Sequence, residues 1–208
     1  MNLKKASLFF LVGLSYHILH NAIFAAFPLL ANNNLIGIIL KYLWLLATST
    51  FILFVYYFLK EVTPLNQQIK ISLKLIIIFI SIMILTSLPI EVFGTTRIIR
   101  NVIFQVSREL NSISLLVFWV YLNKTISDKY SLRQSIRLLI YISVIDVIIG
   151  LMHIYYGLNF IITGHEVMAF PPIKFLSIIL FILKYLSVIF FLIKFRKIDD
   201  YSKSIKKV

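Results

Sequence analysis

The sequence predicts an all-α, multi-pass membrane protein: a bundle of six transmembrane helices with both termini in the cytoplasm. Three observations support this fold class. The mean hydropathy of +0.94 and the 60% hydrophobic content lie far outside the range of a soluble domain. Apolar runs of about 20 residues, long enough to cross a hydrocarbon core, recur along the whole chain. Finally, lysine and arginine are dense in alternate linkers, as the positive-inside rule describes.

The expected spans are read from these apolar runs. They cover residues 6–30, 35–59, 71–90, 101–123, 138–162 and 174–195. The run after the N-terminal MNLKK is too long for a signal peptide and contains His17 and His20, so we interpret it as the first span. The five prolines fall at span ends or in linkers, which predicts unbroken helices. Residues 1–195 should form one transmembrane domain, followed by a short basic cytoplasmic tail, 196–208.

The distribution of positive charge predicts the orientation. Of the 21 lysines and arginines, fifteen lie at the N-terminus, in or beside the second and fourth linkers, and in the tail; four lie on the other side and two within spans. This places both termini in the cytoplasm and makes anionic lipid headgroups, not nucleic acid, the natural partner of the net charge of +13. Heavy use of Ile and Lys is typical of an AT-rich genome, which points to a bacterial cytoplasmic membrane. No feature of the sequence specifies an oligomeric state or a protein partner.

Polar residues inside the spans are the candidate functional residues, because their cost in lipid must be offset by partners or by a role. Helical spacing places several of them on one face of their helix. They are Asn101, Gln105, Arg108, Glu109 and Ser112 in the fourth span, Asp146 and His153 in the fifth, His17, His20 and Asn21 in the first, and Lys184 in the sixth.

At about 1.5 Å per residue, several of these side chains come to similar depths. Slightly outward of the midplane lie His20, Arg108, Glu109 and His153, whereas Lys184 lies near it and Asp146 a little to its inner side. We therefore expect one buried polar cluster that binds a small ligand or ion, for sensing or transport. Arg108 and Lys184 would meet an anionic or carbonyl group, while the carboxylates and histidines relay protons. The alternative is purely structural: Arg108 could pair with Glu109 or with Asp146 and lock the bundle.

Two other functional classes stay open. A b-type haem would need two histidines on different helices at matched depth, which His20 and His153 satisfy, with His17 as a substitute. An intramembrane hydrolase or lipid-modifying enzyme could use a carboxylate base, a histidine and an arginine, and a zinc site would draw on the same histidines. However, no catalytic signature is present, and the chain has no cysteine. We expect no cofactor, no metal and no enzymatic activity.

Overall fold

The computed structural model is all-helical and describes residues 1–26, 34–62, 65–88, 97–126, 132–163 and 171–197. Its six helices run in the order α1 (Leu3–Ala26), α2 (Asn34–Glu61), α3 (Gln67–Ser87), α4 (Arg97–Thr125), α5 (Leu132–Thr163) and α6 (Pro171–Phe195). Each one overlaps an expected span, with its ends shifted by a few residues; residues 27–30 and 89–90 of the first and third expected spans lie outside the described residues. The helices are continuous, as the positions of the prolines predict. Residues 198–208 of the expected tail lie outside the described residues.

Five of the six helices are long and apolar enough to cross a membrane. The chain is therefore a multi-pass membrane protein. The remaining helix, α4, is long enough but less apolar than the others. Its 29 residues include five charged ones, namely Arg97, Arg100, Arg108, Glu109 and Lys124. A span at α4 stays a prediction.

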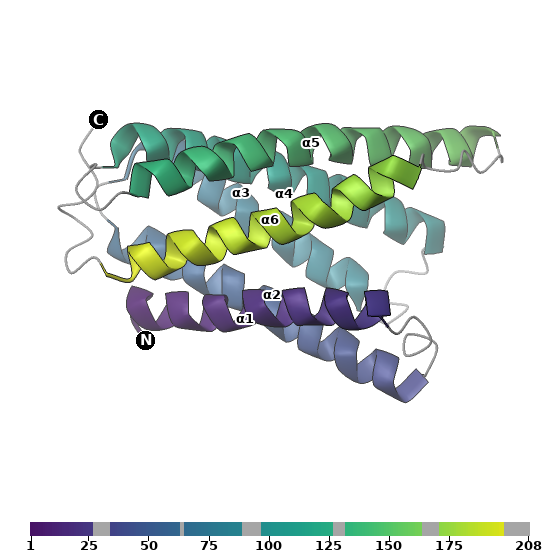
Figure 1. Cartoon of the computed structure of the whole chain (residues 1–208), viewed down its shortest axis with the longest axis horizontal. Coiled ribbons are helices and arrows are strands. Elements are labelled where there is room, and N and C mark those ends of the chain that lie inside the picture. The colour runs from purple at the N-terminus through teal and green to yellow at the C-terminus, as the bar shows by residue number, and fades with distance from the viewer. Residues whose placement is uncertain (27–33, 63–64, 89–96, 127–131, 164–170, 198–208) are drawn as a thin grey trace.

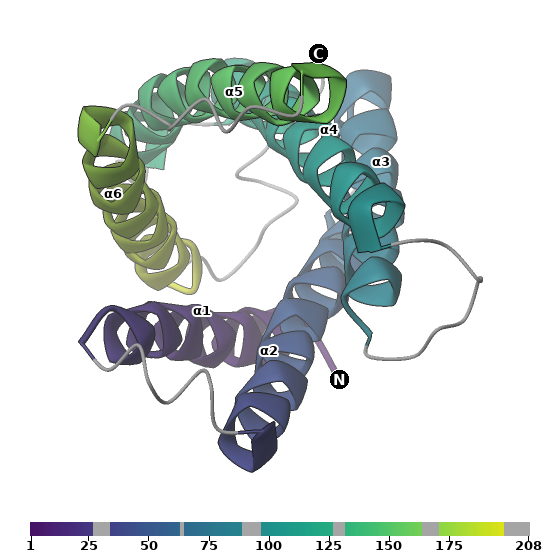
Figure 2. The ribbon, with the colours of Figure 1, turned by 90° about the vertical axis from the view of Figure 1, so that its right-hand side faces the viewer.

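The helices form a ring. Figure 2 looks along the bundle and shows α1 to α6 following one another around it. Each helix packs against its neighbours in sequence, and α1 also contacts α6, which closes the ring. The start of α1 and the end of α6 lie at the same end of the bundle, on the left in Figure 1. There, the side chain of Glu61 at the end of α2 accepts a hydrogen bond from the Leu3 amide at 3.0 Å.

This left-hand end contains the tightly packed core. Five phenylalanines from α2, α4 and α6 are 0–3% exposed and contact one another with ring centroids 5.5–6.2 Å apart; this aromatic cluster consists of Phe54, Phe58, Phe118, Phe191 and Phe195. Such offset and edge-on ring packing adds specific attraction to the burial of area. Large side chains therefore hold the helices together.

The outside of the ring is apolar. Leu46 is 65% exposed, Val12 59% and Ile148 54%, and large aliphatic side chains on all six helices are similarly exposed. A soluble monomer rarely exposes contiguous apolar surface on this scale. The surface therefore fits a lipid environment. At the other end of the molecule α2 and α5 diverge, on the right in Figure 1.

Candidate functional site

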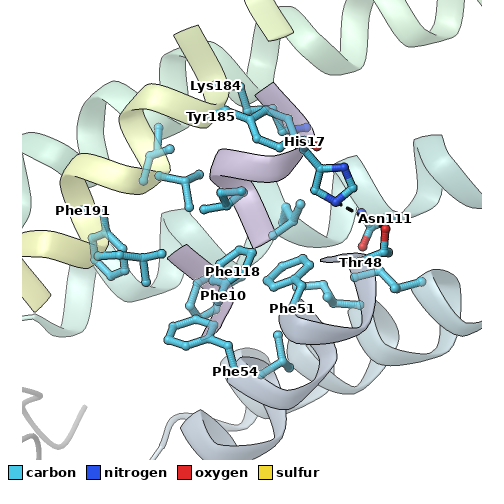
Figure 3. Close-up of a pocket in the computed structure, with 18 of the residues that line it drawn as sticks. Phe10, His17, Thr48, Phe51, Phe54, Asn111, Phe118, Lys184, Tyr185 and Phe191 are labelled. Carbon is cyan, nitrogen blue, oxygen red and sulfur yellow. Dashed lines mark hydrogen bonds between the residues drawn. The ribbon is translucent and has the colours of Figure 1, made fainter. Parts of the chain in front are cut away.

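A cavity of about 150 Å³ lies inside the ring, and all six helices contribute to its wall. Its lining changes character along the bundle axis. One end is bounded by the aromatic cluster and by Phe10 and Phe51, whose rings stack with centroids 4.6 Å apart. The other end has polar side chains from α1, α2, α4, α5 and α6; these are His17, Thr48, Asn111, Ser143 and Lys184. Figure 3 shows the histidine, threonine and asparagine together, away from Phe54 and Phe191.

His17 joins α1 to α2 at the polar end. Its side chain is buried, and its Nε2 lies 3.4 Å from the Thr48 hydroxyl, as the dashed line in Figure 3 marks. The ring also meets Trp44 and Tyr185 edge-on, each with centroids 5.8 Å apart. The packing of His17 by α2 and α6 therefore fixes its position beside the cavity.

Lys184 carries the charge nearest the cavity, and that charge is paired. Its ammonium contacts the Asp146 carboxylate at 2.5 Å, and the same carboxylate oxygen accepts a hydrogen bond from Ser112 at 3.0 Å. The two charged side chains are 21% and 29% exposed. This network ties α4, α5 and α6 together at the level of the polar end.

Arg108 pairs with its neighbour Glu109. The guanidinium donates two hydrogen bonds, at 2.7 and 2.9 Å, to the same oxygen of Glu109. Glu109 is only 4% exposed, and its second oxygen, Oε2, has no hydrogen-bond partner within the described part of the chain. The carboxylate packs directly onto Gly150 of α5, where a side-chain methyl group would overlap it. Gly150 thus makes room for the buried carboxylate.

The remaining predicted residues make contacts within their own helices. His153 bonds the Ile149 carbonyl of its own helix at 3.0 Å, and the ring of His20 lies 5.7 Å from that of Tyr16 in α1. Asn21 is exposed and donates to the His17 carbonyl at 2.8 Å. The expectation that Gln105 faces the bundle interior is wrong, because its side chain is exposed. The turn of α4 that carries Gln105 lies towards the end where α2 and α5 diverge.

The polar contacts thus form two groups. Arg108, Glu109, Ser112, Asp146 and Lys184 make contacts among α4, α5 and α6, whereas His17 contacts Asn21 of its own helix and Thr48 of α2. The two histidines of the haem hypothesis, His20 and His153, belong to α1 and α5, which lie on opposite sides of the ring (Figure 2). Among the described residues, no three His, Asp or Glu side chains gather as metal ligands.

Three polar residues that line the cavity were missed by sequence reasoning: Thr48, Asn111 and Ser143. One signal was available for Asn111. It stands four residues before Leu115 and seven before Phe118, so the three share a helical face, and all three line the cavity. The side-chain carbonyl oxygen of Asn111, Oδ1, is buried and has no hydrogen-bond partner in the described residues.

No protein-family model matches the chain, and neither a curated protein nor a solved structure matches it at a significant level. The fold and the cavity define its class, a helical membrane protein with a ring of six helices around a central cavity. Its function must be inferred from the contacts of its own residues.

Proposed function

We propose that the protein spans the bacterial cytoplasmic membrane six times, with both termini inside, and that it binds a small molecule in the central cavity as a sensor. The observation that carries the proposal is the cavity itself. Every helix of the ring contributes to its wall, and polar groups gather at one of its ends. Ligand sites in membrane bundles are typically apolar spaces with a few convergent polar groups.

The sixth span would be α4. Its 29 residues extend about 43 Å as a helix, longer than a hydrocarbon core of about 30 Å. Its central charges are paired with each other, which lowers their cost in lipid. The α4 helix also packs between α3 and α5, both apolar enough to span. With six spans, both termini lie on one side, in agreement with the uneven distribution of lysine and arginine.

Two features favour sensing over transport. The helices of the ring are continuous, whereas transporters usually break helices near the midplane to form their sites. In addition, the aromatic cluster fills the space between α2, α4 and α6 at one end of the cavity. A solute passing through would have to displace several rings that are almost fully buried. A ligand can instead bind and alter helix packing without crossing.

The topology is tested with a reporter pair, one active only in the cytoplasm and one only outside. Fusions after Val208 and after Lys60 should both read as cytoplasmic, whereas a fusion after Gly94 should read as external. A cytoplasmic reading after Lys60 together with an external one after Val208 would mean an odd number of spans between them and would refute the six-span arrangement.

Ligand binding is tested by a thermal-stability screen of small charged and neutral molecules against the detergent-purified protein. A compound that stabilises the wild type should lose its effect in Val188→Phe, which fills the cavity. Leu46→Phe adds a ring at a position that is 65% exposed and serves as the matched control. If every stabilising compound acts equally on both variants, the cavity is not the site. A Soret band in the visible spectrum of protein produced with ample haem would replace this proposal with the haem one.

A further inference from the structure

The charges beside the cavity are balanced without a ligand. Lys184 lines the cavity but contacts Asp146, and Arg108 contacts Glu109. Each pair is neutral as a whole, so a charged ligand would bring a charge that these pairs do not compensate. A ligand with a net charge would also leave water for a largely apolar space, at a high desolvation cost. The cavity is therefore suited to a neutral molecule.

The size and the lining of the cavity favour an aromatic ring. Its volume of about 150 Å³ is close to that of an engineered apolar cavity that holds benzene. Aromatic side chains supply much of the wall, including Phe51, Phe118 and Trp119. A flat ring can pack edge-on or offset against such side chains, as they already pack against one another.

One acceptor at the polar end, the side-chain oxygen of Asn111, lacks a hydrogen-bond donor among the described residues. This oxygen is buried at the cavity wall. Figure 3 shows Asn111 beside His17 and Thr48, at the polar end. Burial of an unpaired amide oxygen is costly, and a ligand that donates to it removes that cost. A hydroxyl or N–H group on the ring would reach this oxygen while the ring stays among the aromatic side chains.

We infer that the cavity binds a neutral, phenol-like molecule, which has a single aromatic ring and one hydrogen-bond donor. The ligand donates this hydrogen bond to the side-chain oxygen of Asn111. This inference rests on the proposed ligand-binding function and specifies the class of ligand.

The test compares two fluorinated probes that differ in one group. In 4-fluorophenol a hydroxyl stands where 4-fluorotoluene has a methyl, and fluorine NMR follows the binding of each to the purified protein in the same detergent. Each probe is compared across variants at fixed detergent concentration, so that its partition into micelles cancels. In Asn111→Leu we expect affinity for 4-fluorophenol to fall about tenfold, the effect of one hydrogen bond, and affinity for 4-fluorotoluene to be retained.

Two cavity-filling variants, Val188→Phe and Ser143→Leu, should remove saturable binding of both probes, and Leu46→Phe should bind both as the wild type does. Two filling variants are used so that a folding defect in one does not decide the result.

Equal loss of both probes in Asn111→Leu, or no loss of 4-fluorophenol, would overturn the assignment of Asn111. The absence of saturable binding of either probe to the wild type would overturn the ligand class. The proposed function would then still be judged by the broader screen, in which charged and larger compounds are tested against Val188→Phe.

Discussion

The two ends of the cavity share α2, α4 and α6, yet the side chains at each end interact in different ways. At the aromatic end, five phenylalanines contact one another and are 0–3% exposed. At the polar end, Lys184 is paired with Asp146 across two helices, and a buried side-chain oxygen of Asn111 has no hydrogen-bond partner in the described chain.

This difference suggests that one end of the cavity stabilises the fold and the other binds a ligand. In lipid, helices gain little from leaving the solvent and associate through close packing and interhelical hydrogen bonds. The aromatic end is held by close packing and should determine stability. At the polar end the hydrogen bonding is incomplete, and a ligand can form a hydrogen bond with the unpaired side-chain oxygen of Asn111. The predictions below test this contrast, from the largest expected effect to the smallest.

The largest effect is expected at the aromatic end. Phe58 is 0% exposed and contacts the rings of Phe54, Phe118 and Phe195. Phe58→Ala should lower the free energy of unfolding by about 3 kcal/mol, because the surrounding rings lose their contacts and cannot fill the space. Unfolding in mixed detergent and SDS measures this change. Leu53→Ala, at a position that is 41% exposed on the same helix, should have little effect. Equal losses in the two variants would mean that the aromatic cluster does not carry the stability.

The next effect concerns the ion pair at the polar end. Asp146→Leu leaves the Lys184 ammonium within the membrane without its partner, and should cost about 2 kcal/mol of unfolding free energy. The double variant with Lys184→Leu removes both charges and should recover most of this loss. The four proteins form a double-mutant cycle, measured by the same unfolding assay. If the double variant is as unstable as the two single losses added together, the two side chains are not coupled.

The sequence predicts the number, positions and continuity of the helices well, because apolar length and proline position act locally. It also identifies the residues that need partners, such as Arg108, Glu109, Asp146 and Lys184. It does not identify the partners, since Glu109 and Asp146 were both available to Arg108 and the choice depends on how α5 and α6 approach α4. Helical periodicity groups residues on a face but does not say which face turns inwards, so Gln105 was placed inside and Asn111 was overlooked.

A smaller effect, with a diagnostic sign, is expected at Gly150. Replacing glycine with alanine within a helix normally stabilises it by up to about 1 kcal/mol. Here the added methyl overlaps the Glu109 carboxylate, which is buried and paired with Arg108. Because moving the carboxylate would disturb this pair, Gly150→Ala should destabilise the protein by about 1 kcal/mol. Leu151→Ala, at the next and 52% exposed position, is the control in the unfolding assay. A more stable Gly150→Ala protein would show that Glu109 moves away without cost, so that its carboxylate is not held against α5.

The smallest effect is expected where α1 meets α2 at the polar end. Thr48→Val keeps the shape of the side chain but removes the hydroxyl that lies 3.4 Å from His17 Nε2 and donates to the Trp44 carbonyl at 2.8 Å. Interhelical hydrogen bonds in membrane proteins average about 0.6 kcal/mol, so the loss of stability should be of that order. Ser49→Ala removes a hydroxyl that bonds the Leu45 carbonyl of its own helix, and should cost less.

A loss of about 2 kcal/mol or more in Thr48→Val would contradict this prediction, because the contact between α1 and α2 would then hold the helices together as firmly as the Asp146–Lys184 pair is expected to. With a small loss, the His17 side of the cavity contributes little to folding. Its polar groups could then exchange contacts with a ligand at little cost in stability. Binding of 4-fluorophenol to the Thr48→Val protein distinguishes the two hydrogen-bonding positions at this end. The affinity should stay within about threefold of the wild type if the ligand donates to Asn111 and not to Thr48.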